Sequence, residues 1–185
     1  MFTLQKVNLP QTIEVCGRRY KIHTDFRYWL RFAQHLQQDK KAPPGTFDYM
    51  YISDKPASRL AGLVALCEFL NPPSELPRRT SDDDKTIVID YEIDAPYIFA
   101  AFYEQYGIDL LKADLKLHWH KFTALLRGLH DTELNNIIQA RLYKPNGRND
   151  EFEKARQKQL EAWRLPQPDE TEPDEAREAF LSQLK

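Results

Sequence analysis

The chain has 185 residues, of which 42% are hydrophobic and 29% charged, a composition typical of a folded protein rather than a disordered one. Its net charge of −2 lacks the basic footprint of a broad nucleic-acid binder, and no stretch resembles a secretory signal or a membrane span. We therefore expect a cytoplasmic protein with one domain over residues 1–165, followed by an acidic, Pro-rich tail over residues 166–185.

An antiparallel β-hairpin is predicted near the N-terminus, over about residues 11–23. Apolar and polar residues alternate on both sides of Gly17, which places a short turn at about Cys16 to Arg18. The inward-facing positions would be Ile13, Val15, Tyr20 and Ile22. Because an isolated hairpin is only marginally stable in water, its apolar side must pack on helices, and its free edge offers a surface for assembly.

A helix is expected to begin after Thr24 or Asp25, either of which can cap it, and to reach about Gln38. Its inner face is apolar and comprises Phe26, Trp29, Leu30, Ala33 and Leu36. An adjoining strip comprises Tyr28, Phe32 and His35. Aromatic strips at helical spacing usually pack inside a protein, so this second strip is either ordinary core or a surface that receives a partner.

The next stretch is predicted to be a loop followed by a second helix. Residues 39–46 oppose helix and strand because they contain two prolines and a glycine, whereas residues 47–52 fit either a helical turn or a strand. A helix capped by Ser53 or Asp54 should then run to Asn71, where two prolines stop it. Its predicted inner face is Leu60, Leu63, Val64, Cys67 and Leu70.

Residues 74–85 are predicted to be a polar loop. Three consecutive aspartates in this loop lack the alternating spacing, the glycine and the terminal glutamate of a calcium-binding loop. Residues 86–91 (TIVIDY) are rich in β-branched side chains and form either a short strand or an extended lead into the next helix.

The clearest start and stop signals of any helix in the chain are at Asp94 and Gly107. Asp94 occupies an N-cap position, Pro96 suits the first helical turn, and Gly107 suits a left-handed C-cap. One face is apolar and comprises Ile98, Ala101, Phe102 and Tyr106. Beside it runs an aromatic stripe of Phe99, Tyr103 and Tyr106. This apolar arc is wider than a surface helix needs, so the helix either is buried on two sides or keeps one side for a partner.

Three more helices are predicted after Gly107. Their bounds are Leu110 or Leu115 to Leu129, then from an Asp131 or Thr132 cap to about Leu142, then Glu151 to Arg164 behind an Asp150 cap. Residues 173–184 form a further helical pattern that is too short to be stable alone. The expected fold class is therefore mainly α, a bundle-like helical domain with a short N-terminal β-hairpin.

Several separated blocks resemble one small family of phage proteins. These blocks are DYEIDAPYIFAAFYEQYGIDL at residues 90–110, LHWHKFTALLRGL at residues 117–129 and IIQARLY at residues 137–143. The opening VCGRRYKIHTDFRYWL at residues 15–30 is also similar to that family. It is the phage gene-product-fifteen family, encoded in the tail morphogenesis cluster of long-tailed phages and prophages near the tape-measure gene. His120 departs from the family pattern, in which a second aromatic residue would follow Trp119.

No pattern in the sequence indicates catalysis. There is no phosphate-binding glycine loop, nucleophile elbow, zinc-type Cys/His spacing or dinucleotide fingerprint. His118 and His120 lie two residues apart, which places them on nearly opposite sides of a helix, whereas helical metal-ligand pairs lie four apart. Cys16 and Cys67 are interpreted as a turn residue and a small core residue. We therefore expect no enzyme, no cofactor and no metal site.

The resemblance implies a role in tail assembly, as a chaperone that binds and shelters helices of the tape-measure protein in the host cytoplasm. The partner surface predicted from surplus aromatic residues comprises Tyr28, Phe32, Phe99, Tyr103 and Trp163. The alternative is a structural head–tail or tail-completion component of the virion, in which the hairpin edge would support a homo-oligomer. In both cases the expected partners are other tail proteins, not nucleic acid or membrane.

Overall fold

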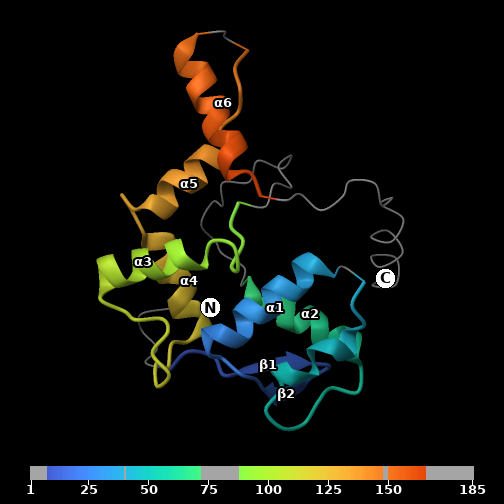
Figure 1. Cartoon of the computed structure of the whole chain (residues 1–185). Helices are drawn as coiled ribbons and strands as arrows, with labels where there is room; N and C mark the ends of the chain where they lie inside the picture. The colour runs from blue at the N-terminus through green and yellow to red at the C-terminus, as the bar shows by residue number, and fades with distance from the viewer. Residues whose placement is uncertain (1–7, 40, 72–87, 148–149, 166–185) are drawn as a thin grey trace.

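The computed structural model describes residues 8–39, 41–71, 88–147 and 150–165 (Figure 1). The fold is mainly helical with a short two-stranded hairpin, which confirms the predicted class. In chain order the elements are β1 (Thr12–Val15), β2 (Arg18–Lys21), α1 (Phe26–Gln38), the 3₁₀ helix η1 (Pro44–Met50), α2 (Arg59–Leu70), α3 (Ala95–Tyr106), α4 (Trp119–Gly128), α5 (Glu133–Arg141) and α6 (Glu151–Trp163). The loop predicted at residues 74–85 and the helical pattern at residues 173–184 lie outside the described residues.

The predicted hairpin forms, and its turn fixes the register of the strands. Cys16 and Gly17 both have positive φ, 51° and 75°, which is the type I′ geometry that matches the twist of antiparallel strands. Val15 therefore pairs with Arg18 across the turn. The buried side of the hairpin comprises Ile13, Val15, Tyr20 and Ile22, as the alternation predicted.

The stretch before α2, left open between helix and strand, forms η1. This 3₁₀ helix begins at Pro44, so the predicted loop over residues 39–46 ends earlier than expected. Phe47 and Met50 are buried in the core, and an isolated bridge between Tyr51 and Ile22 then borders β2. The short helix thus places the Phe47 and Met50 side chains in the core, and the backbone that follows it pairs with the hairpin.

The prediction for α2 was wrong about both its start and its buried face. The cap is Ser58 rather than Ser53 or Asp54, and its hydroxyl accepts a hydrogen bond from the Ala61 N–H (3.3 Å). The buried residues are Gly62, Leu63, Ala65, Leu66 and Phe69, of which only Leu63 belongs to the predicted face. Because this helix is apolar almost all round, the spacing of its hydrophobic residues does not select one face.

Aromatic rings from α1, α2, α3 and α4 build the centre of the core. Trp29 of α1 is fully buried, and its ring stacks on Phe69 of α2 (4.6 Å between centroids) and Trp119 of α4 (6.2 Å). Phe122 of α4 continues the stack to Phe102 of α3 (5.1 Å). Such ring pairs contribute about 0.5–1.5 kcal/mol each beyond simple burial. The contact between α1 and α4 therefore lies at the centre of the core, and α2 and α3 pack against it.

Helix α4 starts at Trp119, later than either predicted start. The backbone before it pairs instead with the lead into α1: the Phe26 N–H donates to the Leu117 carbonyl (2.9 Å), and the Trp119 N–H donates to the Thr24 carbonyl (2.8 Å). These bonds hold residues before Trp119 out of a helix. The Arg27 guanidinium adds support by donating to three carbonyls of the same loop, those of Leu110, Lys112 and Leu115.

The two helices α5 and α6 extend from one end of the body (Figure 1). α5 starts with a capping box in which Thr132 and Asn135 exchange side-chain and backbone hydrogen bonds, and α6 starts with Asp150, whose carboxylate accepts from the Glu153 N–H (2.7 Å). Thr132 and Asp150 were both predicted as caps. As expected from its charge, α6 is mostly exposed.

Two histidines fasten the start of α4 to neighbouring elements. Nδ1 of His118 accepts from the His120 N–H (3.1 Å), so the His118 proton lies on Nε2, which donates to the Pro10 carbonyl (2.9 Å). Nε2 of His120 donates to the Phe69 carbonyl at the end of α2 (2.9 Å). Burial lowers the pKa of both rings below the ordinary 6.5, although each bond to a carbonyl acts in the opposite direction.

We expect stability to decrease on mild acidification. Because the folded-state pKa values of His118 and His120 lie below 6.5, the unfolded chain binds more protons, so the stabilisation is complete above about pH 6.5 and is lost as pH falls. His118→Asn keeps an N-cap without a titrating ring and should lose less stability between about pH 7.5 and pH 5.5. Urea unfolding at each pH measures the difference.

The matched control is His130→Gln, which changes an exposed histidine. It should keep the full pH dependence of the unmodified chain. An equal pH dependence in the His118 and His130 variants would contradict a role for His118 as a neutral cap.

Candidate partner-binding surface

The five residues predicted to bind a partner fall into different environments. Phe32 is fully buried, with its ring packed edge-on against Trp29 (5.5 Å) and Phe47 (5.0 Å). The expectation that Phe32 contributes to an exposed surface was therefore wrong. The strip on α1 turns inward at Phe32 because η1 packs over it, a contact that the helical spacing alone did not reveal.

Tyr28 and Trp163 are accessible, but each ring already has an internal neighbour. Tyr28 is 38% exposed and stacks flat on His23, with 4.1 Å between centroids and 3° between planes. Trp163 is half-buried and meets Tyr97 of α3 edge-on at 5.6 Å. These two aromatic residues therefore help to place α1 and α6, which leaves less of each ring for a partner.

Phe99 and Tyr103 form an aromatic pair on α3. Their rings lie 6.1 Å apart and within 18° of parallel, as residues one helical turn apart allow. Tyr103 is 59% exposed and Phe99 is half-buried. Tyr97, which contacts Trp163, lies two residues from Phe99 and so points to the opposite flank of α3. The structure thus brings Phe99 and Tyr103 together and separates them from Trp163.

The aromatic pair belongs to a longer uncharged surface that we call the α3 stripe. It comprises Pro96, Phe99, Ala100 and Tyr103, which follow helical spacing along the outer side of α3, together with Ile93 in the turn before the helix. Ile93 is 52% exposed, and Pro96 and Ala100 are exposed as well. The sequence prediction found the two aromatic residues and missed the other three. Proline in a first helical turn and alanine within a helix occur in buried and in exposed helices alike, so their presence did not indicate an exposed surface.

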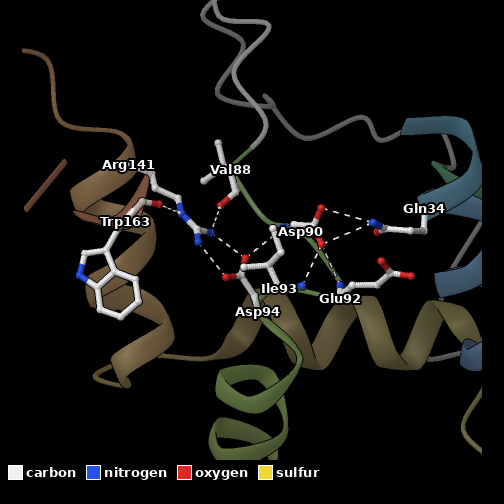
Figure 2. A network of polar contacts seen from close by, with 8 residues as sticks. All are labelled: Gln34, Val88, Asp90, Glu92, Ile93, Asp94, Arg141 and Trp163. Atoms are coloured by element: carbon white, nitrogen blue, oxygen red, sulfur yellow. Dashed lines mark hydrogen bonds and ion pairs between the residues drawn. The ribbon is translucent and has the colours of Figure 1, made fainter. Parts of the chain in front are cut away.

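A buried ion pair anchors the start of α3, next to this stripe (Figure 2). Arg141, at the end of α5, binds Asp94 through two hydrogen bonds of 2.6 and 2.8 Å, and side-chain exposure is only 4% and 1%. Arg141 also donates to the carbonyls of Val88 (2.9 Å) and Trp163 (2.7 Å). One guanidinium therefore joins α5, the stretch that leads into α3 and the end of α6.

Asp94 does not cap α3 with its side chain, contrary to the capping role that its position predicted. Its carboxylate is engaged by Arg141 and by the Asp90 N–H (2.9 Å). Gly107 does provide the predicted left-handed end of the helix, with φ of 64°. The positions of Asp94, Pro96 and Gly107 located the helix correctly. The ion pair could not be predicted from residues near Asp94, because its partner lies 47 positions away in the chain.

Asp90 shapes the turn that leads into α3. Its Oδ1 accepts the N–H groups of Glu92 and Ile93, both at 2.9 Å, and its carboxylate also receives the amide of Gln34 from α1 (3.3 Å). Burial acts to raise the pKa of Asp90, but these hydrogen bonds and the charge of Arg141 together hold it below its ordinary value. The ionised carboxylate therefore ties the turn to α1 (Figure 2).

A family model with the description "Bacteriophage Gp15 protein" matches residues 69–164, just over half of the chain. The chain belongs to the bacteriophage Gp15 family. The match includes α3 with its stripe, the Asp94–Arg141 pair and α6, whereas the similar opening at residues 15–30 lies outside it. Comparisons with curated proteins and with solved structures gave no match.

Membership in the Gp15 family indicates a phage structural or morphogenesis protein, and the family is not known as enzymatic. Among the described residues no group of three or more His, Cys, Asp or Glu side chains is placed to hold a metal ion. None of the helices in the described ranges is both long and apolar enough to cross a bilayer.

An open hollow of about 360 Å³ lies between α1 and the turn before α3. It is lined by Leu30, Arg31, Gln34, His35, Gln38, Tyr91 and Glu92.

We expect the single substitution Asp94→Asn to destabilise the protein strongly. It leaves the Arg141 guanidinium buried without a counter-charge, which typically costs about 3–5 kcal/mol. Arg141→Met should have a similar cost, because it leaves the Asp94 carboxylate buried and unpaired. The double variant should lose less than the sum of the two single losses, as urea unfolding measured by far-UV circular dichroism would show. Strictly additive losses would contradict direct coupling of the two charges.

Proposed function

We propose that this Gp15-family protein is a non-enzymatic tail-assembly chaperone that binds helices of the tape-measure protein along its α3 stripe. The observation that carries the proposal is the exposed, uncharged stripe with its Phe99–Tyr103 pair. An elongated protein with amphipathic helices would expose apolar faces before the tail tube surrounds it, and such faces aggregate unless they are covered. Temporary burial of these faces is the task of a chaperone.

The shape of the α3 stripe suits an approaching helix. Pro96 and Ala100 are small and lie along the middle of the stripe, so the backbone of a second helix can come close to α3 there. Phe99 and Tyr103 stand to one side and offer large apolar rings to the partner. This arrangement is that of a helix docking on a helix, with aromatic anchors beside a shallow path.

The expected strength of this contact favours reversible binding. Complete burial of two aromatic side chains contributes roughly 3–6 kcal/mol, and Phe99 is already half-buried. Association costs about 4–15 kcal/mol in lost freedom of the two molecules. One stripe therefore holds a helix only weakly, and several copies bound along one long partner would be needed for lasting protection.

We expect co-expression to raise the soluble fraction of the tape-measure protein from the same phage and to allow both proteins to be purified together. Phe99→Ser with Tyr103→Ser should abolish both effects because it removes the aromatic anchors. The matched control is Phe152→Ser, which changes another exposed aromatic residue (68% exposed), located on α6. The control should retain both effects, and circular dichroism should show all three proteins folded.

Two results would contradict the proposal. The first is a folded double variant that still keeps the tape-measure protein soluble, since the α3 stripe would then not be the binding surface. The second is the presence of this protein in purified virions at the stoichiometry of a structural component, measured by mass spectrometry. That result would favour the alternative, a head–tail or tail-completion protein.

A further inference from the structure

We infer that the α3 stripe selects partner helices whose apolar side is bordered by lysine or arginine. This inference rests on the proposed function, because it specifies the chemistry of the helix that the same stripe would bind. It follows from the charges around the stripe, which are independent of the apolar side chains that make the stripe itself.

The segment that carries the stripe is acidic over its whole length. Residues 88–111 contain five acidic side chains and no lysine or arginine, namely Asp90, Glu92, Asp94, Glu104 and Asp109. This segment departs from the average of the chain, which has nearly balanced charges, with 26 basic and 28 acidic residues. Exposed carboxylates beside an apolar strip attract a cationic partner and repel an anionic one.

The acidic residues differ in their availability to a partner. Asp94 is buried and neutralised by Arg141, and Asp90 is committed to the turn before α3. Glu92 and Glu104 are both exposed, and in the chain Glu92 precedes Ile93 and Glu104 follows Tyr103. The Glu92 carboxylate also accepts a hydrogen bond from the Gln38 amide of α1 (3.4 Å), so it is held at the α1 side of the turn. Asp109, also exposed, follows shortly after the end of α3. A partner lying along the stripe would have a carboxylate near each end.

The same charges argue against a second copy of this chain as the occupant. Two α3 stripes packed face to face would bring Glu92 and Glu104 of one molecule close to the same acidic residues of the other. Like charges across an interface are unfavourable, so a symmetric pairing through this surface is opposed. An amphipathic helix with basic residues beside its apolar face meets both requirements, the apolar contact and the opposite charge.

The inference can be tested with the full-length protein and two synthetic peptides. Both peptides are amphipathic helices with one identical leucine and alanine face, which is bordered by lysine in the first and by glutamate in the second. Fluorescence anisotropy measures the affinity of each labelled peptide at low and at high ionic strength. We expect the lysine peptide to bind at least about ten-fold more tightly at low salt, and the difference to shrink at high salt.

Substitutions then identify the groups responsible. Glu92→Gln with Glu104→Gln should reduce affinity for the lysine peptide by about two- to five-fold per lost pair and leave the glutamate peptide no weaker. Glu151→Gln is the matched control, since it removes an exposed carboxylate at the start of α6, the end of that helix opposite to the one that contacts α3, and should change neither affinity. Phe99→Ser with Tyr103→Ser should abolish binding of the lysine peptide.

Equal affinity for the two peptides, or no binding of either, would overturn the charge selectivity. Binding of the lysine peptide that survives Phe99→Ser with Tyr103→Ser would also overturn it, because attraction to acidic surface in general would then explain the result. These outcomes are separate from those of the chaperone test, which uses the tape-measure protein itself. Selective peptide binding without tape-measure binding would retain the site and reject only the proposed chaperone function.

Discussion

The ion pair of Asp94 and Arg141 determines how the helical half of the molecule is arranged. Two charges with so little exposure are tolerated only if their remaining hydrogen-bonding groups are satisfied. The carbonyls of Val88 and Trp163 and the N–H of Asp90 meet that requirement. A hydrophobic contact of similar size could stabilise the junction equally well. The two parallel hydrogen bonds of the ion pair also fix the relative orientation of the end of α5 and the start of α3.

This constraint explains why an exposed apolar strip can stay ordered on α3. The start of the helix is fixed by α5, by the end of α6 and, through Asp90, by α1. Its other side packs into the core through Phe102 and Ile98. The outer side therefore has a defined shape before any partner arrives, which reduces the ordering cost of binding.

The sequence correctly predicted those features that depend on residues close to one another in the chain. Caps at Thr132 and Asp150, the C-cap at Gly107 and the alternating hairpin were all found, because each depends on residues within a few positions of one another. The errors at α2 are local, because several capping residues precede it and its apolar residues surround the helix. The errors at α3 and α4 concern distant contacts. The start of α4 depends on backbone pairing with Thr24 and Phe26, which helical propensity does not include.

The candidate surface was predicted in part for the same reason. Phe99 and Tyr103 stood out because two aromatic residues shared one side of a capped helix. Phe32 gave the same pattern, but η1 covers it through Phe47, and no spacing within α1 reveals that cover. A helical stripe shows which residues share a side, whereas only the packed fold shows which side remains open.

The pairing between the lead into α1 and the residues before α4 also affects the order of folding. Phe26 bonds to Leu117, and Trp29 of α1 stacks on Trp119, so these contacts join positions about ninety residues apart in the chain. During synthesis the first half leaves the ribosome before α4 can pack on Phe26 and Trp29, so the sides of these two rings that face α4 are uncovered until α4 follows. Closure of this core is thus a late event, and the nascent chain passes through a stage in which its own apolar surface is open to aggregation.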